Sequence, residues 1–152
     1  MTKTTASRAN AALWTVQLLL GALFLFGGGF KLVVPIAVIA KQMPVVLPGA
    51  FIRLIGVLEL TGGLGLVLPG LLRLHRALTP LAAGGLVLIM CGAIGVTITT
   101  GPFNLAAFPF AVGLLAAVVA YGRARIVPLS GTSRSAHAPR AATVRPLART
   151  AA

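Results

Sequence analysis

Glu59 is the residue of this sequence whose chemical type is hardest to reconcile with its surroundings. It is the only acidic residue among 152, and it lies near the middle of an apolar run that extends from about residue 50 to 68. An ionised carboxylate at the centre of a bilayer is unfavourable by roughly 2.5–3.5 kcal/mol even on lenient insertion scales. We therefore expect Glu59 to be either protonated or paired with a cation.

Two basic residues are candidates for that pairing. Arg53 precedes Glu59 by six residues in the same run, which in a helix turns it well off the Glu59 face and separates the two by about 9 Å along the axis. Lys31 lies close to the end of the preceding apolar run, and its long side chain can reach into the membrane towards Glu59. We predict an intramembrane polar site of Glu59, Lys31 and Arg53, in which Lys31 is the better partner. Two interpretations stay open: a charged pocket that receives a substrate, a quinone or a proton, and a buried ion pair that fixes helix register.

The elements that must position this site are membrane-spanning helices. Apolar residues make up 58% of the chain and charged residues only 9%, whereas soluble domains average about 25% charged residues. A run of about 20 apolar residues crosses the hydrocarbon core, and we predict four such spans at about 11–34, 50–68, 80–98 and 104–121. The predicted fold is an all-α, polytopic four-helix transmembrane bundle over residues 1–122, followed by a disordered, Arg-rich tail over 123–152.

Local signals suggest how the spans pack and where they end. Small residues allow transmembrane helices to approach closely, and Gly56, Gly62 and Gly63 surround Glu59 in the second span. Gly56 and Gly63 share the Glu59 face and should admit the first span. Pro69 is expected to end the second span. Thr79 and Asn104 are predicted N-caps of the third and fourth spans, and we expect the hydroxyls of Thr97, Thr99 and Thr100 to bond to preceding carbonyls.

The distribution of basic residues predicts topology and argues against nucleic acid as a partner. The thirteen lysines and arginines lie mostly in tails and short connections that flank the apolar runs. Such placement is typical of membrane topology signals and of contact with anionic lipid headgroups. Four spans put both termini on one side, which also carries most of the basic residues. We therefore expect a multi-pass inner or plasma membrane protein with both termini, and the tail, in the cytoplasm.

Several catalytic classes are excluded by residue types alone. One acid rules out two-carboxylate catalysis. The single cysteine, Cys91, provides no CxxC pair, and His75 and His137 lie outside the spans, so no metal cluster is predicted. We assign no catalytic residue and expect no catalysis by this chain alone.

Three stretches resemble the DoxX-like family of small four-helix bacterial membrane proteins. They are residues 23–32 (LFLFGGGFKL), residues 53–69 (RLIGVLELTGGLGLVLP) and residues 78–83 (LTPLAA) followed by 90–94. By this resemblance, the motif positions are Lys31, Gly56, Glu59 and Pro69. Many members carry a histidine or another polar group at the end of the third span, where residues 96–100 offer only threonines. This departure argues against a proton or metal role at that end.

The resemblance implies a weakly defined link to redox metabolism. The family name comes from a membrane subunit of a thiosulfate–quinone oxidoreductase. We therefore expect a membrane subunit or scaffold in quinone-linked, sulfur or oxidative-stress redox metabolism, with a membrane or peripheral redox protein, or a second copy of the chain, as partner. One alternative is a quinone- or lipid-binding component of an oxidoreductase, with quinone as the only cofactor considered. Another is a small transporter or proton path that uses Glu59.

Overall fold

The computed structural model describes residues 3–43, 47–72, 75 and 77–127, and the secondary structure of these residues is entirely helical. The long helices are α1 (Lys3–Val33), α3 (Gly49–Leu71), α4 (Leu78–Thr100) and α5 (Ala107–Tyr121). A short helix, α2 (Ile36–Ala40), follows α1. A 3-10 turn, η1 (Phe103–Ala106), precedes α5, and a π turn, η2 (Gly122–Ile126), continues it.

Four helical segments of the described chain are long and apolar enough to cross a membrane. They cover Ser7–Val33, Gly49–Leu71, Leu78–Thr100 and Phe103–Ile126, with 23 to 27 residues each. Large apolar side chains lie on the outside of the bundle; Phe26, Leu88 and Phe103, for example, are 74%, 73% and 77% exposed. Hydrocarbon suits such a surface, whereas water does not. The predicted all-α fold with four spans is confirmed.

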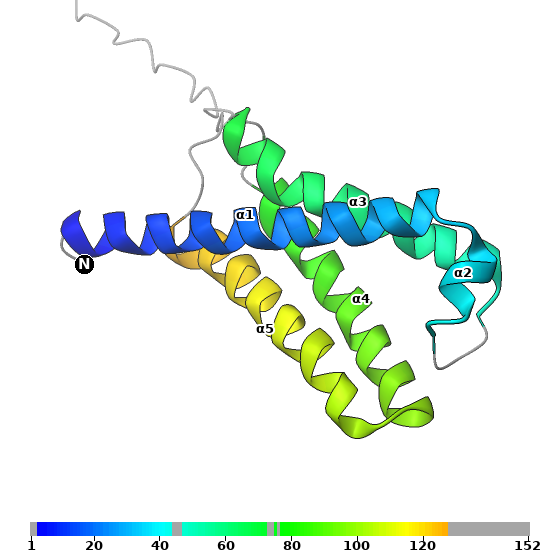
Figure 1. Ribbon diagram of the computed structural model, residues 1–152. Coiled ribbons are helices and arrows are strands. Elements are labelled where there is room, and N and C mark those ends of the chain that lie inside the picture. Colours follow the sequence, from blue (N-terminus) through cyan, green and yellow to red (C-terminus); the bar gives the residue numbers. More distant parts are fainter. Residues whose placement is uncertain (1–2, 44–46, 73–74, 76, 128–152) are drawn as a thin grey trace, which may run out of the picture.

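The spans form two pairs that cross each other. α1 packs along α3 and α4 packs along α5, while α3 also contacts α4 and α1 also contacts α5. Figure 1 shows the α1–α3 pair crossing the α4–α5 pair obliquely, with α2 folded beside the far ends of α1 and α3. The beginning of α1 and the end of the fourth span lie at the same end of the bundle, as an even number of crossings requires.

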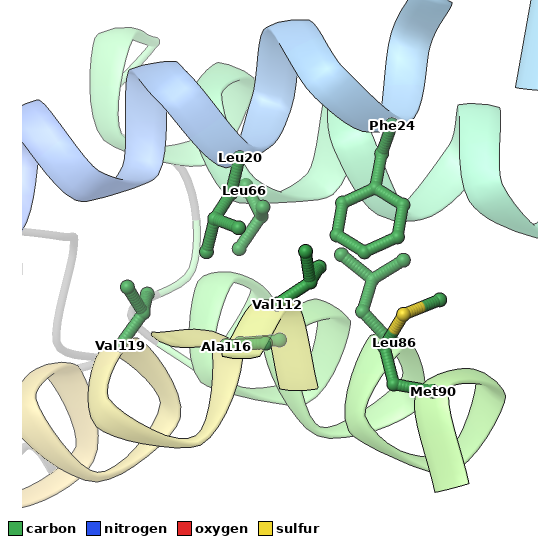
Figure 2. Packing of buried hydrophobic residues seen from close by; sticks show 9 residues of the cluster. Leu20, Phe24, Leu66, Leu86, Met90, Val112, Ala116 and Val119 are labelled. Carbon is green, nitrogen blue, oxygen red and sulfur yellow. The ribbon is translucent and has the colours of Figure 1, made fainter. Parts of the chain in front are cut away.

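The apolar core lies where the two pairs cross. Figure 2 shows Leu20 and Phe24 of α1 meeting side chains from the other three spans. The remaining members of this cluster are Leu66, Ala83, Leu86, Met90, Val112, Ala116 and Val119. Ala83 and Ala116 are completely buried, and such small side chains let helix backbones come close together.

Glycines bring α1 and α3 into backbone contact. A Cβ atom added to Gly28 would lie 2.7 Å from the Gly56 carbonyl oxygen, and one added to Gly63 would lie 3.1 Å from the Gly21 carbonyl oxygen. Gly62 faces α4 instead, because a Cβ atom there would lie 2.6 Å from Leu86. Gly56 and Gly63 therefore lie against α1, on the face shared with Glu59, and Gly62 lies against the other pair.

Two helices extend beyond the predicted spans. α1 begins at Lys3 rather than near residue 11, because the polar residues 3–10 also form helix. α3 continues through Pro69 to Leu71. Since Pro69 lies in the last turn, it removes only one backbone hydrogen bond near a helix end, and the helix closes beyond it with a bond from the Leu72 amide to the Leu68 carbonyl.

Both predicted N-caps were also wrong. α4 begins at Leu78 after Ala77, and Thr79 is a fully buried residue of its first turn. Pro80 therefore occupies the third helical position, where its missing amide hydrogen is tolerated as well as at the first. Asn104 lies inside η1, which follows Pro102 and has no side-chain cap. The threonine prediction is confirmed: the hydroxyls of Thr97, Thr99 and Thr100 donate to carbonyls three or four residues earlier.

Candidate functional site

The structure brings Lys31 and Glu59 together between α1 and α3. Lys31 Nζ donates to Glu59 Oε2 at 2.6 Å, and the two side chains are 24% and 7% exposed. Glu59 lies ten residues into α3, about 15 Å along the helix from Gly49. Because both charged groups are largely withdrawn from solvent, each depends on the other for compensation.

The glycines beside the ion pair have distinct effects. Gly56 contacts Lys31 directly, since an added Cβ atom would lie 3.0 Å from the Lys31 Cβ atom. A Cβ atom on Gly27 would lie 3.6 Å from Glu59 Oε2 and 3.9 Å from Lys31 Nζ. Gly28 and Gly56 therefore permit the close helix approach that places the pair, and Gly27 leaves room next to the charged atoms.

Arg53 belongs to the same cluster but does not bond to Glu59 in the described structure. Its Nη1 atom donates to the backbone carbonyl of Lys31. This carbonyl lies in the last turn of α1, where carbonyls lack helical partners and cations are favourable. Arg53 thus caps α1 from α3 and holds the backbone of the residue that pairs with Glu59.

A cavity opens beside the ion pair. It has a volume of about 320 Å³ and is lined by Lys31 together with Phe26, Gly27, Phe30, Ile39, Gln42 and Met43. The rings of Phe26 and Phe30 stack with their centroids 6.5 Å apart. Polar contributions come from the Lys31 ammonium and the Gln42 amide, and the rest of the lining is apolar. The arrangement suits a flat, largely apolar group that carries a hydrogen-bond acceptor.

A second polar cluster, which sequence reasoning missed, lies at the opposite end of α1. Arg123 was predicted to belong to a disordered tail, but it lies in η2 and is 1% exposed. Its Nε atom donates to Gln17 Oε1, and its Nη1 atom donates to Asn10 Oδ1 at 2.7 Å. The guanidinium also lies over the Trp14 ring, 5.3 Å from the centroid. The rest of the predicted tail, residues 128–152, lies outside the described residues.

Gln17 connects this second cluster to α3. It is completely buried, and its Nε2 atom donates to the Leu66 backbone carbonyl at 2.7 Å. The sequence did contain a signal, because Gln17 is an isolated amide inside the first apolar run, and buried amides require partners. Arg123 gave a weaker signal, since arginines continue beyond it into the polar segment.

Among the residues that the structure describes, no group of three histidine, cysteine or acidic side chains could hold a metal ion. The fold and the ion pair define a multi-pass, four-helix membrane protein with a partly buried acid–base pair between its first two spans.

The sequence model of the DoxX-like family matches residues 15–119, which is more than half of the chain. The chain belongs to the DoxX-like family. Comparisons with curated proteins and with solved structures gave no match.

Proposed function

We propose that this protein is a non-catalytic membrane subunit that binds the head group of a quinone, or of a similar carbonyl-bearing lipid, beside Lys31, while a partner protein supplies the redox chemistry. The observation that carries the proposal is the cavity in which Lys31 lies next to two stacked phenylalanines. The DoxX-like resemblance to a quinone-linked subunit supports the same assignment.

The size and lining of the cavity fit such a ligand. Small-molecule sites in proteins commonly have volumes of about 300–1,000 Å³, so a cavity of about 320 Å³ suits one substituted ring rather than a larger cofactor. Phe26 and Phe30 offer aromatic surface to a planar ring. The ligand's apolar tail would remain in the surrounding lipid.

Lys31 has hydrogen-bonding capacity to spare. An ammonium group has three donors, and one of them is directed at Glu59 Oε2. A second can donate to a ligand carbonyl at the cavity. In this proposal Glu59 orients the Lys31 ammonium, and Arg53 fixes the Lys31 backbone.

The proposal includes an orientation in the plasma membrane. Most of the lysines and arginines lie in the two terminal segments and in the connection between the second and third spans, and segments rich in these residues stay in the cytoplasm. The cavity would then lie towards the opposite, outer face. A C-terminal fusion to a fluorescent protein that folds only in the cytoplasm should be fluorescent, and a periplasm-dependent phosphatase fusion should be inactive.

Ligand binding can be tested with the full chain in lipid nanodiscs. We would measure equilibrium binding of a short-chain benzoquinone to the wild type and to the Phe26→Ala and Phe30→Ala variants. Both variants should weaken binding by about tenfold, which corresponds to 1.4 kcal/mol each. The matched control is Phe103→Ala, which removes a phenylalanine of η1 that is 77% exposed, compared with 74% for Phe26 and 38% for Phe30.

Equal binding by all four proteins would contradict the quinone assignment. Non-specific partitioning of the hydrophobic quinone into the nanodisc lipid would then explain the signal without a protein site. Loss of binding in Phe103→Ala to the same extent would lead to the same conclusion.

A further inference from the structure

The positive charge of Arg123 has no acidic side chain as a partner among the residues that the structure describes. Its three described acceptors are neutral: the Gln17 and Asn10 side-chain amides and the Val127 carbonyl. The only acidic side chain, Glu59, is already bonded to Lys31. That pair is 14 residues farther along α1 than Gln17, a separation of about 21 Å. A guanidinium remains charged in proteins, so its counter-ion must come from outside this chain's side chains.

The same guanidinium has an unused donor. Arg123 Nη2 is buried and has no hydrogen-bond partner. A second buried group without a partner, the Thr79 hydroxyl, lies in the first turn of α4, an element that contacts η2. Buried polar atoms are nearly always satisfied in native proteins, and exceptions often mark a bound water or ion. Two such atoms at one end of the bundle indicate a polar ligand there.

The position of Arg123 in the membrane indicates what that ligand is. Arg123 lies in the last turn of the fourth span, next to Trp14 and close in sequence to the exposed Tyr121. Tryptophan and tyrosine mark the headgroup level of a bilayer, which is where lipid phosphates lie. Exposed Arg8 and Arg125 belong to the same end of the bundle and add positive charge. Arginine is the side chain best suited to bind phosphate oxygens.

We propose that Arg123 is the centre of a binding site for the phosphate of an anionic phospholipid. One phosphate oxygen accepts from Nη2. A second oxygen accepts from Nη1 in place of the Val127 carbonyl, whose bond to Nη1, at 3.3 Å, is the longest of those that hold the guanidinium. Gln17 and Asn10 keep the guanidinium in place during this exchange, and Trp14 covers its face. The site is separate from the quinone cavity and does not depend on the proposed function.

The site is tested by counting bound lipids on the full chain with native mass spectrometry after delipidation in mild detergent. Dioctanoyl phosphatidylglycerol is the probe, and dioctanoyl phosphatidylcholine and inorganic phosphate are the comparison ligands at equal ionic strength. The wild type should bind one phosphatidylglycerol at least about tenfold more tightly than phosphatidylcholine. Arg123→Gln should lose this preference, whereas Arg125→Gln, which removes an exposed arginine two residues away, should retain it.

A thermal-unfolding series on the wild type keeps the proposal testable if Arg123→Gln does not fold. Phosphatidylglycerol should raise the unfolding midpoint, and phosphatidylcholine should raise it less. Equal responses to the two lipids, or loss of the preference in Arg125→Gln, would overturn the proposal, since general surface charge would then explain it. A full response to inorganic phosphate alone would assign the site to a free anion and overturn the lipid source. A preference that appears only when a co-purifying protein is present would assign the counter-ion to that partner and overturn the lipid proposal.

Discussion

The two polar clusters of this protein each hold a cationic side chain that is largely withdrawn from solvent, but they compensate its charge differently. At one end of the α1–α3 pair, the charge of Lys31 is balanced by Glu59 at 2.6 Å. At the other end, Arg123 is held by two amide side chains, a carbonyl and an aromatic ring, all of them neutral. In the first cluster the positive charge is neutralised by an acidic side chain. In the second cluster the guanidinium is held by hydrogen bonds, but its charge is not neutralised by any of its described partners.

This difference follows from depth in the membrane. The Glu59 carboxylate lies near the middle of α3, far from lipid phosphates, so its charge must be compensated by the chain itself, and Lys31 does so from the last turn of α1. Arg123 lies in the last turn of its span, within reach of headgroups, so the chain needs to supply only orientation. Four variants, ordered from the largest expected effect to the smallest, would break or sharpen this comparison.

Glu59→Ala should be the most damaging of these changes. It leaves the Lys31 ammonium without its counter-charge in a largely buried position, and breaking a buried ion pair from one side typically costs about 3–5 kcal/mol. Folded yield in mild detergent should fall sharply. The Lys31→Ala, Glu59→Ala double variant should recover part of that yield, because neither charge then remains. A double variant that is no better than either single variant would refute the pairing.

Gly28→Ala should separate α1 from α3 and disturb the ion pair indirectly. The added Cβ atom would lie 2.7 Å from the Gly56 carbonyl oxygen and 2.8 Å from the Leu60 amide nitrogen, both of them backbone atoms. Overpacking of this kind costs about 1–3 kcal/mol, measurable as a lower thermal midpoint. Gly29→Ala is the neighbouring control, since a Cβ atom there meets nothing within 4 Å. Equal midpoints for the two variants would rule out close packing at Gly28.

Gln17→Leu should weaken the second cluster by a smaller amount. The substitution keeps the bulk but removes the acceptor of Arg123 Nε and the donor to the Leu66 carbonyl. Groups left unsatisfied in this way cost about 1–3 kcal/mol, with a value near the low end expected because headgroups can compensate Arg123. Chemical denaturation would measure the loss, with Thr15→Ala, an exposed site two residues earlier, as a control. A loss of stability as large as that of Glu59→Ala would show that the Arg123 cluster depends on partners within the chain as strongly as the Lys31–Glu59 pair does.

Arg53→Leu should have the smallest effect. It removes one hydrogen bond to the Lys31 carbonyl and a cation near the end of α1, interactions worth about 1 kcal/mol together. Lys41→Leu removes an exposed cation nearby and serves as the control. A loss comparable to that of Glu59→Ala would mean that Arg53, rather than Lys31, carries the compensating charge.

The first cluster could be predicted from the sequence because an unpaired carboxylate in a membrane span is energetically very unfavourable. A lone acid in an apolar run requires a partner or a proton, and few cations are within reach, so residue types and spacing were enough to associate Lys31 with Glu59. The positions of Gly56 and Gly63 followed from helical periodicity relative to Glu59. The cavity beside Lys31 could not be predicted, since it depends on where α2 folds after Pro35.

The second cluster escaped sequence reasoning because each of its parts has an ordinary explanation. One amide in a span, such as Gln17, costs little, and Arg123 stands at the start of an Arg-rich segment that resembles a tail. Only tertiary contact between the beginning of α1 and η2 makes them a cluster. The cap errors at Thr79 and Asn104 have a similar origin, because packing shifted helix starts by a residue or more from the positions that local propensity favoured.

The charge state of Glu59 tests the central claim most directly, and the sequence makes the measurement unusually clean. Since Glu59 is the only acidic side chain, an infrared difference spectrum between the wild type and Glu59→Gln isolates its carboxyl signal. The ion pair with Lys31 predicts an ionised carboxylate at neutral pH in the wild type and a protonated carboxyl in Lys31→Met. A protonated carboxyl in the wild type would contradict the ion pair.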